Sequence, residues 1–306
     1  MKRIFLVLAI ILAIIGNSKI LAAENGGLFL SPPFTDISLD IKQPEKAFYL
    51  EIGNNTYTET VFDISVVDFG SLDETGGVAF LTVNNDKNER KYSLASWISL
   101  EKQTVTVMPG KTEKIKVTIL NKDSLSPGGH YGAVLATVRT AADRAKDMVG
   151  INQSLASLIY VQKTGGEKPN LIFKSWEFSK NIFYFPKTVK IRFENNGNVH
   201  VVPRGKVEIK NSQGEIIAKG IINGDSGKIL PESFRIMELP IENKVRRWNR
   251  PGIYNMDVSY RFDGRDEFLS MKTKVIYVGF EGVLVVSGLA LITALIVTLI
   301  LRKIRR

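Results

Sequence analysis

The fold class follows from the stretch Tyr254–Phe262, which reads YNMDVSYRF. Aromatic or aliphatic residues occupy every second position, and polar residues lie between them. A period of two places alternate side chains on opposite faces of an extended strand, so that one face is buried and the other meets water. This pattern is typical of antiparallel sheets, because the strands of parallel α/β sheets are apolar on both faces.

Shorter runs with the same alternation occur through the middle of the chain, and no convincing helical period interrupts them. They read KIKVTI at 114–119, VKIRF at 189–193 and VEIK at 207–210. Many short strands separated by turn residues predict β-sandwiches. We therefore expect an all-β protein over most of its length.

Three landmarks occur twice, in the same order, and indicate an internal duplication. They are an asparagine pair at a strand end, a proline turn, and a Pro-Gly pair followed by a tyrosine. Their positions are Asn54-Asn55 and Asn195-Asn196, then Pro109 and Pro231, then Pro127-Gly128 and Pro251-Gly252. The repeat predicts two tandem immunoglobulin-like sandwiches at 24–165 and 166–280. The first copy carries about 19 extra residues, which we place within 70–93 as a surface loop or short hairpin.

A tyrosine follows the Pro-Gly pair in both copies, at Tyr131 and Tyr254. In immunoglobulin-like sandwiches a tyrosine near the start of the penultimate strand can donate its hydroxyl to upstream backbone and stabilise a sheet corner. We expect this structural role for both residues by analogy. The alternative is an ordinary core aromatic at the start of a strand.

The first 23 residues have the order of a secretory signal peptide. Lys2 and Arg3 precede an apolar run at 4–15, and a more polar stretch ends at Ala22 and Ala23. The apolar run is short for a membrane-spanning helix. Cleavage after Ala23 would place Leu21 at the third position before the cut, where a small residue is preferred, so an uncleaved anchor is the alternative.

Residues 282–301 form an uncharged apolar run near the other end of the chain. Twenty residues at 1.5 Å each cover about the 30 Å of a bilayer's hydrocarbon core. This run predicts one transmembrane helix. A basic tail at 302–306 follows it and, by the positive-inside rule, predicts a cytoplasmic C-terminus and an extracellular N-terminal part. The topology anchors in this tail are Arg302, Lys303, Arg305 and Arg306.

Composition excludes several functional classes. The 306 residues include no cysteine and only two histidines, His130 and His200, which we expect to lie in turns or at the surface. A thiolate metal site and a cysteine nucleophile are therefore excluded, and imidazole chemistry has few residues to use. We expect no catalytic residues, no cofactor and no metal site, and hence no enzyme.

The net charge of +10 does not indicate a nucleic-acid partner, because of where the charge lies. Three of these charges belong to the first 23 residues and four to the last five, where they act as topology signals. A local cluster remains in the second sandwich around Trp248. It is a candidate contact for anionic polymer or lipid headgroups, and its members are Lys244, Arg246, Arg247 and Arg250.

The stretch from 97 to 138 resembles a family of Gram-positive surface proteins. It carries VTVMPGK at 105–111, IKV at 115–117 and PGGHYGAV at 127–134. These runs are similar to the peptidoglycan-binding immunoglobulin-like domain of the WxL-interacting proteins. The order of signal peptide, two β domains, helix and basic tail is also similar. The resemblance implies a non-catalytic envelope protein that binds peptidoglycan and partner surface proteins.

We therefore expect a single-pass membrane protein that acts as an envelope binding or scaffold module. Its expected partners are peptidoglycan or another wall polymer, surface proteins and the lipid bilayer, but not nucleic acid. The alternative is a membrane-tethered chaperone-like assembly subunit that acts by strand exchange. A further alternative is an enzyme on a sandwich scaffold. An exposed long hydrophobic strand edge would favour the assembly subunit, a deep pocket with convergent polar groups would favour an enzyme, and a flat or loop-built surface would favour wall binding.

Overall fold

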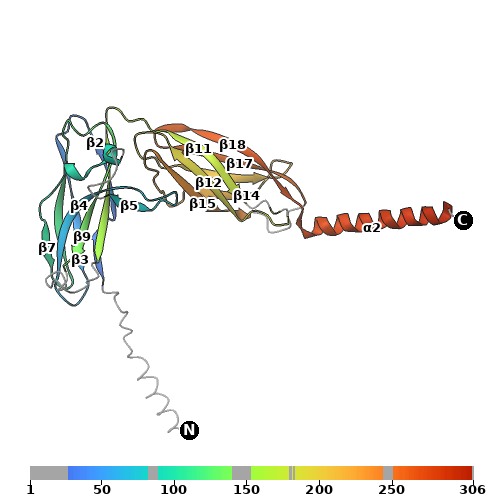
Figure 1. Ribbon diagram of the computed structural model, residues 1–306, viewed down its shortest axis with the longest axis horizontal. Coiled ribbons are helices and arrows are strands. Elements are labelled where there is room, and N and C mark those ends of the chain that lie inside the picture. Colours follow the sequence, from blue (N-terminus) through green and yellow to red (C-terminus); the bar gives the residue numbers. More distant parts are fainter. Residues whose placement is uncertain are drawn as a thin grey trace, which may run out of the picture.

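The computed structural model describes residues 27–81, 89–139, 153–178, 181, 183–243 and 251–304. Within these ranges the chain is built of strands, two short 3-10 turns and one long helix. Figure 1 shows two β-sandwiches set at an angle to one another, with the helix leaving the far end of the second. The predicted fold class of two tandem immunoglobulin-like sandwiches and an apolar helix is confirmed. The signal peptide expected at 1–23 lies outside the described residues.

The first sandwich packs two sheets face to face. One sheet has the strand order β1 (Leu28–Ser31), β3 (Glu45–Asn54), β8 (Lys111–Leu120), β6 (Ile98–Leu100). The other has the order β2 (Phe34–Leu39), β10 (Ser154–Lys163), β9 (Gly128–Val138), β4 (Thr60–Ser71), β5 (Val78–Leu81), and β7 (Thr104–Val107) also pairs with β4. The 3-10 turns η1 (Glu89–Tyr92) and η2 (Ala95–Trp97) precede β6.

Alternation explains most of these strands. In β8, Ile115, Val117 and Ile119 are fully buried, while Lys116 between them is exposed and Thr118 is half-buried. The exception is β9, which is buried on both faces from Gly128 to Val134. Its second face packs at the junction between the sandwiches, where Tyr131 joins Phe69 and Tyr160 in a small aromatic cluster.

The second sandwich packs a sheet of three strands on a sheet of five. The smaller sheet has the order β11 (Leu171–Phe178), β12 (Thr188–Asn195), β15 (Ser233–Pro240). The larger has the order β16 (Glu242–Asn243), β14 (Ile216–Ile222), β13 (Arg204–Lys210), β17 (Gly252–Phe262), β18 (Arg265–Tyr277). The stretch that decided the fold class forms β17, and its alternate residues from Tyr254 to Phe262 are buried in the core.

The duplication has a physical basis in two buried asparagines. Asn54 Nδ2 donates to the carbonyl oxygen of Val107 at 2.9 Å, two residues before the proline turn of the first copy. Asn195 Nδ2 donates in the same way to Ile229 at 2.8 Å, two residues before the turn of the second. Each asparagine therefore joins a strand end to the proline turn of its own sandwich, because a buried amide must find hydrogen-bond partners.

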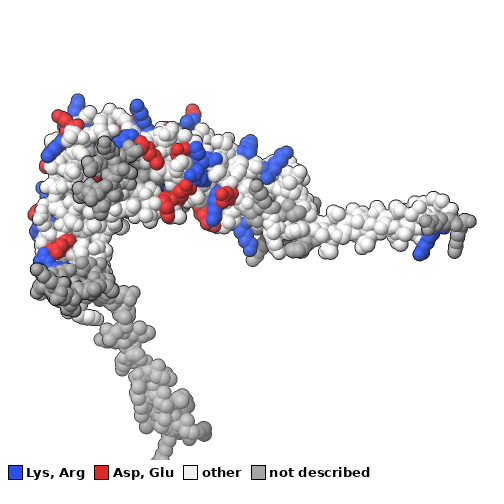
Figure 2. Space-filling view, viewed as in Figure 1, with Lys and Arg blue, Asp and Glu red and all other residues white. Residues whose placement is uncertain are grey.

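The helix α2 (Gly279–Ile304) follows β18 after a single residue, Val278. Its stretch Gly282–Ile304 has a mean hydropathy of 2.8, and none of its apolar window is buried within the described chain. It is long enough and apolar enough to cross a membrane. Figure 2 shows the helix free of charge over most of its length, with basic side chains only toward its end.

Candidate functional site

The insertion in the first sandwich forms a hairpin that reaches the second sandwich. Its strands are the end of β4 and β5, and its turn closes with a hydrogen bond of 2.9 Å from Leu72 N–H to the Gly77 carbonyl. Figure 1 shows β5 on the side of the first sandwich that faces the second. We expected a surface loop or hairpin here, but sequence reasoning missed that its tip docks on the other domain.

Two contacts fix the tip of this hairpin. The Arg192 guanidinium donates to both carboxylate oxygens of Glu74, at 2.6 and 2.7 Å. These hydrogen bonds hold the pKa of Glu74 below its usual range. The main-chain carbonyl of Glu74 accepts a hydrogen bond of 2.7 Å from the N–H of Ile236 on β15. The first sandwich thus touches the edge of the smaller sheet in the second.

That hydrogen bond shows which residues of β15 turn their main-chain groups away from β12. Ile236 lies opposite Arg192 on β12, yet its N–H points away from β12 toward Glu74. In an antiparallel pair, residues alternate between bonding the neighbouring strand and pointing away from it. Glu238, two residues further and opposite Lys190, therefore also turns its N–H and carbonyl to the open side. Leu239 turns its N–H and carbonyl toward β12.

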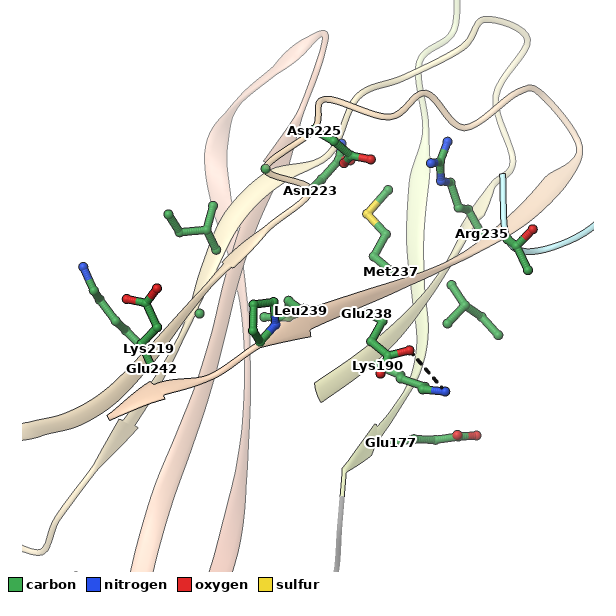
Figure 3. A pocket seen from close by; sticks show the side chains of 16 residues that line it. Glu177, Lys190, Lys219, Asn223, Asp225, Arg235, Met237, Glu238, Leu239 and Glu242 are labelled. Atoms are coloured by element: carbon green, nitrogen blue, oxygen red, sulfur yellow. Dashed lines mark ion pairs between the residues drawn. The ribbon is translucent and has the colours of Figure 1, made fainter. Parts of the chain in front are cut away.

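A groove of about 750 Å³ runs along this open side, between β15 and β14. Met237 and Leu239 are buried and form its apolar floor. Figure 3 shows them between two charged ends, with Asp225 and Arg235 at one end and Lys219 and Glu242 at the other. Such a mixture of an apolar floor and a few polar groups at the rim is typical of binding sites.

The groove narrows toward Gly220, where β14 meets the end of β15. A Cβ atom added at Gly220 would lie 2.7 Å from Leu239 Cδ1 and 2.8 Å from the Pro240 carbonyl oxygen. Only glycine permits this close approach. Directly after Pro240 the chain crosses to the larger sheet and forms β16 beside β14. The free part of the β15 edge therefore lies between this end and Ile236, where the hairpin docks.

The rim charges are held in place by neighbours. Lys190 Nζ lies 3.4 Å from a carboxylate oxygen of Glu238, as the dashed line in Figure 3 marks. Arg235 donates to the main-chain carbonyl of Lys228 at 2.8 Å, which positions its guanidinium at the end of the groove beside the hairpin. Both side chains of the Lys190–Glu238 pair are about half exposed, so this ion pair contributes little to stability.

A second hollow, of about 640 Å³, lies at the junction of the two sandwiches. Lys228 Nζ lies 3.1 Å from Asp36 and 4.6 Å from the ring centres of both Phe34 and Tyr160. Burial alone would raise the pKa of Asp36, but hydrogen bonds from His200 and Lys228 hold it below its usual range. Asp36 of the first sandwich thus contacts Lys228 and His200 of the second across the junction.

The structure places the two histidines differently from our expectation. His130 is buried, and its ring nitrogens lie 3.0 Å from the Ser93 carbonyl oxygen and 2.7 Å from that of Ser126. His200 lies at the junction, with its side chain only 11% exposed, beside Asp36. The prediction of a turn or surface position is therefore wrong for His130, which lies in β9 and is covered by residues of its own sandwich. His200 follows the bends at 197–199 as expected, but the first sandwich covers it there.

Tyr131 also takes part in the junction. Its buried hydroxyl lies 3.4 Å from His200 Nδ1 of the second sandwich, so the contact runs across the junction instead of back to upstream backbone. This contact and the surrounding rings favour the alternative of a core aromatic. Tyr254 is buried at the start of β17 and packs edge-on against Phe185. Its predicted corner role stays a prediction.

The predicted basic cluster falls outside the described residues, as do two of the four topology anchors. The cluster comprises Lys244, Arg246, Arg247 and Arg250, and the two anchors are Arg305 and Arg306. The anchors Arg302 and Lys303 lie in the last turn of α2. Among the described residues, no group of three or more acidic or histidine side chains is placed to hold a metal ion.

Sequence reasoning missed another junction contact, formed by Glu232. Its carboxylate accepts hydrogen bonds of 2.7 Å from Lys91 Nζ and 2.8 Å from the Tyr92 hydroxyl. The bond with Glu232 helps to raise the pKa of Lys91 to about 12. Both ends of the insertion, at Glu74 and at Lys91, thus bind the second sandwich. The only signal for this was the extra length of the first copy.

No model of a known protein family matches the sequence, and no curated protein matches it. Among solved structures, the class 5 fimbriae chaperone CfaA is similar, with 13% identity and a TM-score of 0.43 over 82% of this chain and 99% of that chain. The CupB2 chaperone of Pseudomonas aeruginosa has 10% identity and a TM-score of 0.35, over 79% and 97%. The E. coli chaperone DraB has 10% identity and a TM-score of 0.36, over 81% and 98%.

Proposed function

We propose that this protein is a non-catalytic, membrane-tethered assembly factor of the chaperone-like kind. In this proposal the second sandwich accepts an extended segment of a partner surface protein along the free edge of β15. The observation that carries the proposal is the direction of the main-chain groups along that edge, where Glu238 presents both its N–H and its carbonyl to an open groove.

An extended segment fits the edge because a strand edge is a row of unpaired donors and acceptors. Addition of a strand to such an edge is a common way to bind peptides, since main-chain hydrogen bonds give affinity and pockets for alternate side chains give specificity. The hydrogen bond from the Ile236 N–H to the Glu74 carbonyl is already a main-chain contact of this kind on the same edge, two residues before Glu238.

The unequal sheets give a second argument. A sheet of three strands packs on a sheet of five, so the smaller sheet has fewer strands and ends at β15. The apolar side chains of Met237 and Leu239 lie beneath this position. A partner segment with apolar residues at every second position would cover them, and the groove between Gly220 and the hairpin tip limits it to about five residues, or about 17 Å.

Tethering follows from α2. With the basic residues Arg302 and Lys303 in its last turn, we infer that the helix crosses the membrane with its C-terminus in the cytoplasm and both sandwiches outside.

Peptidoglycan, the ligand that the resemblance to WxL-interacting proteins implies, stays a prediction. The β15 groove does not favour it over a polypeptide, because the groups that the groove presents are main-chain donors and acceptors in strand geometry. Sedimentation of the protein with purified peptidoglycan measures this alternative directly. Retention there, with no binding of extended peptides, would replace the present proposal with wall binding.

The test uses the full chain in lipid nanodiscs and a display library of random peptides. We expect enrichment of peptides with apolar residues at every second position. A chemically synthesised member of the enriched set then provides the ligand for affinity measurements. Enrichment of patterns with a helical period, or no enrichment, would contradict strand addition.

Two variants at one position provide the matched control. Glu238→Pro removes the N–H that faces the groove and fills the space beside it with the ring, while edge positions tolerate proline. Glu238→Ala removes the carboxylate and its ion pair with Lys190 but keeps the N–H. We expect the proline variant to lose peptide binding at least tenfold and the alanine variant to keep it. Equal affinities would mean that the side chain, or another surface, binds the peptide.

A further inference from the structure

The outer face of the larger sheet in the second sandwich carries an exposed aliphatic pair close to the helix. Ile253 on β17 and Ile276 on β18 lie directly opposite one another. Their side chains face away from the core and are 58% and 57% exposed. Exposed isoleucines occur singly on many proteins, so the position of this pair relative to α2 decides its meaning.

The end of the sandwich is level with the start of the apolar run. A Cβ atom added at Gly282 would lie 3.1 Å from Pro251 Cγ, so Pro251 packs directly on the first turn of α2. The uncharged run begins at Gly282 and is as long as the hydrocarbon core is thick. Pro251 therefore lies at the boundary of the hydrocarbon.

Strand geometry then gives the height of the pair above this boundary. Ile253 is two residues from Pro251, and a strand rises about 3.3 Å per residue, so Ile253 lies at most about 7 Å further out. The headgroup layer is about 5–8 Å thick on each side of the hydrocarbon. Ile276 shares the level of Ile253 because the two residues are paired.

Polarity changes along the same face in the order that a membrane surface requires. The pair next above the isoleucines is Asn255 with Lys274, and the one after it is Asp257 with Lys272. Long lysine side chains reach readily to the phosphate level while their stems pack on apolar surface. Apolar residues thus lie nearest the hydrocarbon, and lysines lie one and two pairs further out.

We infer that this face of the β17–β18 pair lies in the headgroup layer of the bilayer that α2 crosses, with Ile253 and Ile276 inserted at its inner boundary. The occupant of the surface is lipid, and it holds the second sandwich down on the membrane at a fixed orientation. This inference rests on the tethering part of the proposed function. It does not depend on peptide binding by the β15 groove.

The absence of cysteine from the sequence makes the test direct, because one introduced cysteine is a unique labelling site. The full chain is reconstituted in liposomes of phosphatidylcholine and phosphatidylglycerol. The variants Ile253→Cys and Ile276→Cys each carry an environment-sensitive fluorophore. Quenching is measured with lipids that bear a nitroxide on the headgroup or deep in the acyl chain.

The chain offers a matched control on the same sheet face. Ile221 is 65% exposed and lies opposite Lys206, which in turn lies opposite Ser259. Ser259 is six residues beyond Ile253, which places Ile221 about 20 Å farther from the membrane. A label in the variant Ile221→Cys therefore reports an isoleucine site of similar exposure that remains in water. A label in Leu291→Cys, within α2, reports insertion of the helix.

We expect the headgroup nitroxide to quench the labels at 253 and 276 several-fold more than the label at 221. The acyl-chain nitroxide should quench the label at 291. Equal quenching at 253, 276 and 221 while the label at 291 is quenched would overturn the inference and leave the tethering intact. Absence of quenching at 291 would overturn the tethering and the inference together.

Discussion

The main-chain carbonyl of Glu74 accepts a 2.7 Å hydrogen bond from the N–H of Ile236. Through this contact a hairpin of the first sandwich occupies one end of the strand edge on which we propose that a partner binds. The contact joins the two domains and also marks where the open part of the edge begins. The Glu74 carboxylate supports it by its paired hydrogen bonds with Arg192.

The variant Glu74→Ala should loosen the hairpin tip, because it removes both hydrogen bonds to Arg192 and leaves only the main-chain contact. We expect amide exchange at Ile236 to become several-fold faster. The control Glu51→Ala removes an ion pair of 3.3 Å with Lys114 inside the first sandwich and should leave Ile236 unchanged. Unchanged exchange at Ile236 in the Glu74 variant would show that the carboxylate does not hold the hairpin.

The variant Asn195→Ala should destabilise the second sandwich. It leaves the carbonyl oxygen of Val199 and the N–H of Gly197 without their buried amide partner, whereas the Ile229 carbonyl keeps its hydrogen bond from the Val201 N–H. Each buried unsatisfied group costs about 1–3 kcal/mol, so we expect the free energy of unfolding to fall by about 2–4 kcal/mol in urea denaturation. The neighbouring Asn196 is exposed, and Asn196→Ala should cost less than about 0.5 kcal/mol. Similar losses in both variants would reject the role assigned to Asn195.

Stability should decrease on mild acidification because of His130. Burial lowers the pKa of this imidazole below its ordinary value, although the carbonyl oxygens of Ser126 and Ser93 favour the charged ring. The unfolded chain then binds a proton more readily than the folded one. The free energy of unfolding should therefore fall as the pH drops below about 6.5, and hold its full value above that pH.

The measurement compares urea denaturation at pH 7.5, 6.5 and 5.5 in the native chain and in His130→Gln. The variant cannot titrate at this position, so its stability should depend less steeply on pH over this range. Parallel pH dependence in the two chains would mean that His130 does not contribute to the loss.

The four basic residues around Trp248 give a prediction that rests on sequence and position. The residues that flank them are described, and Gly252 pairs with Tyr277, two residues before α2 begins. Replacing the four by glutamine should weaken binding of the full chain in neutral nanodiscs to anionic liposomes or wall polymer at low salt. A control replaces four exposed lysines of the first sandwich, namely Lys42, Lys102, Lys111 and Lys116. Equal binding by both sets of variants would reject a specific role for the cluster.

The strands were predictable where one face meets water. In β8 and β17 the alternation of apolar and polar residues identifies strand and buried face together. The repeated asparagines were visible as landmarks, although their shared bond to the proline turn needed coordinates. By contrast, β9 is buried on both faces, because residues distant in sequence cover its second face, among them Tyr92 of the insertion and Leu230 of the other domain.

The candidate site was not predictable, for a related reason. The open edge of β15 depends on which strand lies beside it, and Ser233–Pro240 would look the same with a neighbour on each side. The hairpin contact is likewise a pairing between residues 162 positions apart, Glu74 and Ile236. Tyr131 and His200 contact one another only because the two sandwiches dock, and His130 is covered by distant segments of its own sandwich.

The most direct test of the central claim is residue-resolved amide exchange on the full chain with and without a peptide selected for binding. We predict that the Glu238 amide, which faces the groove, becomes strongly protected when the peptide binds. The Leu239 amide, which faces β12, should change little. Protection that appears elsewhere while the Glu238 amide exchanges as before would contradict strand addition at β15.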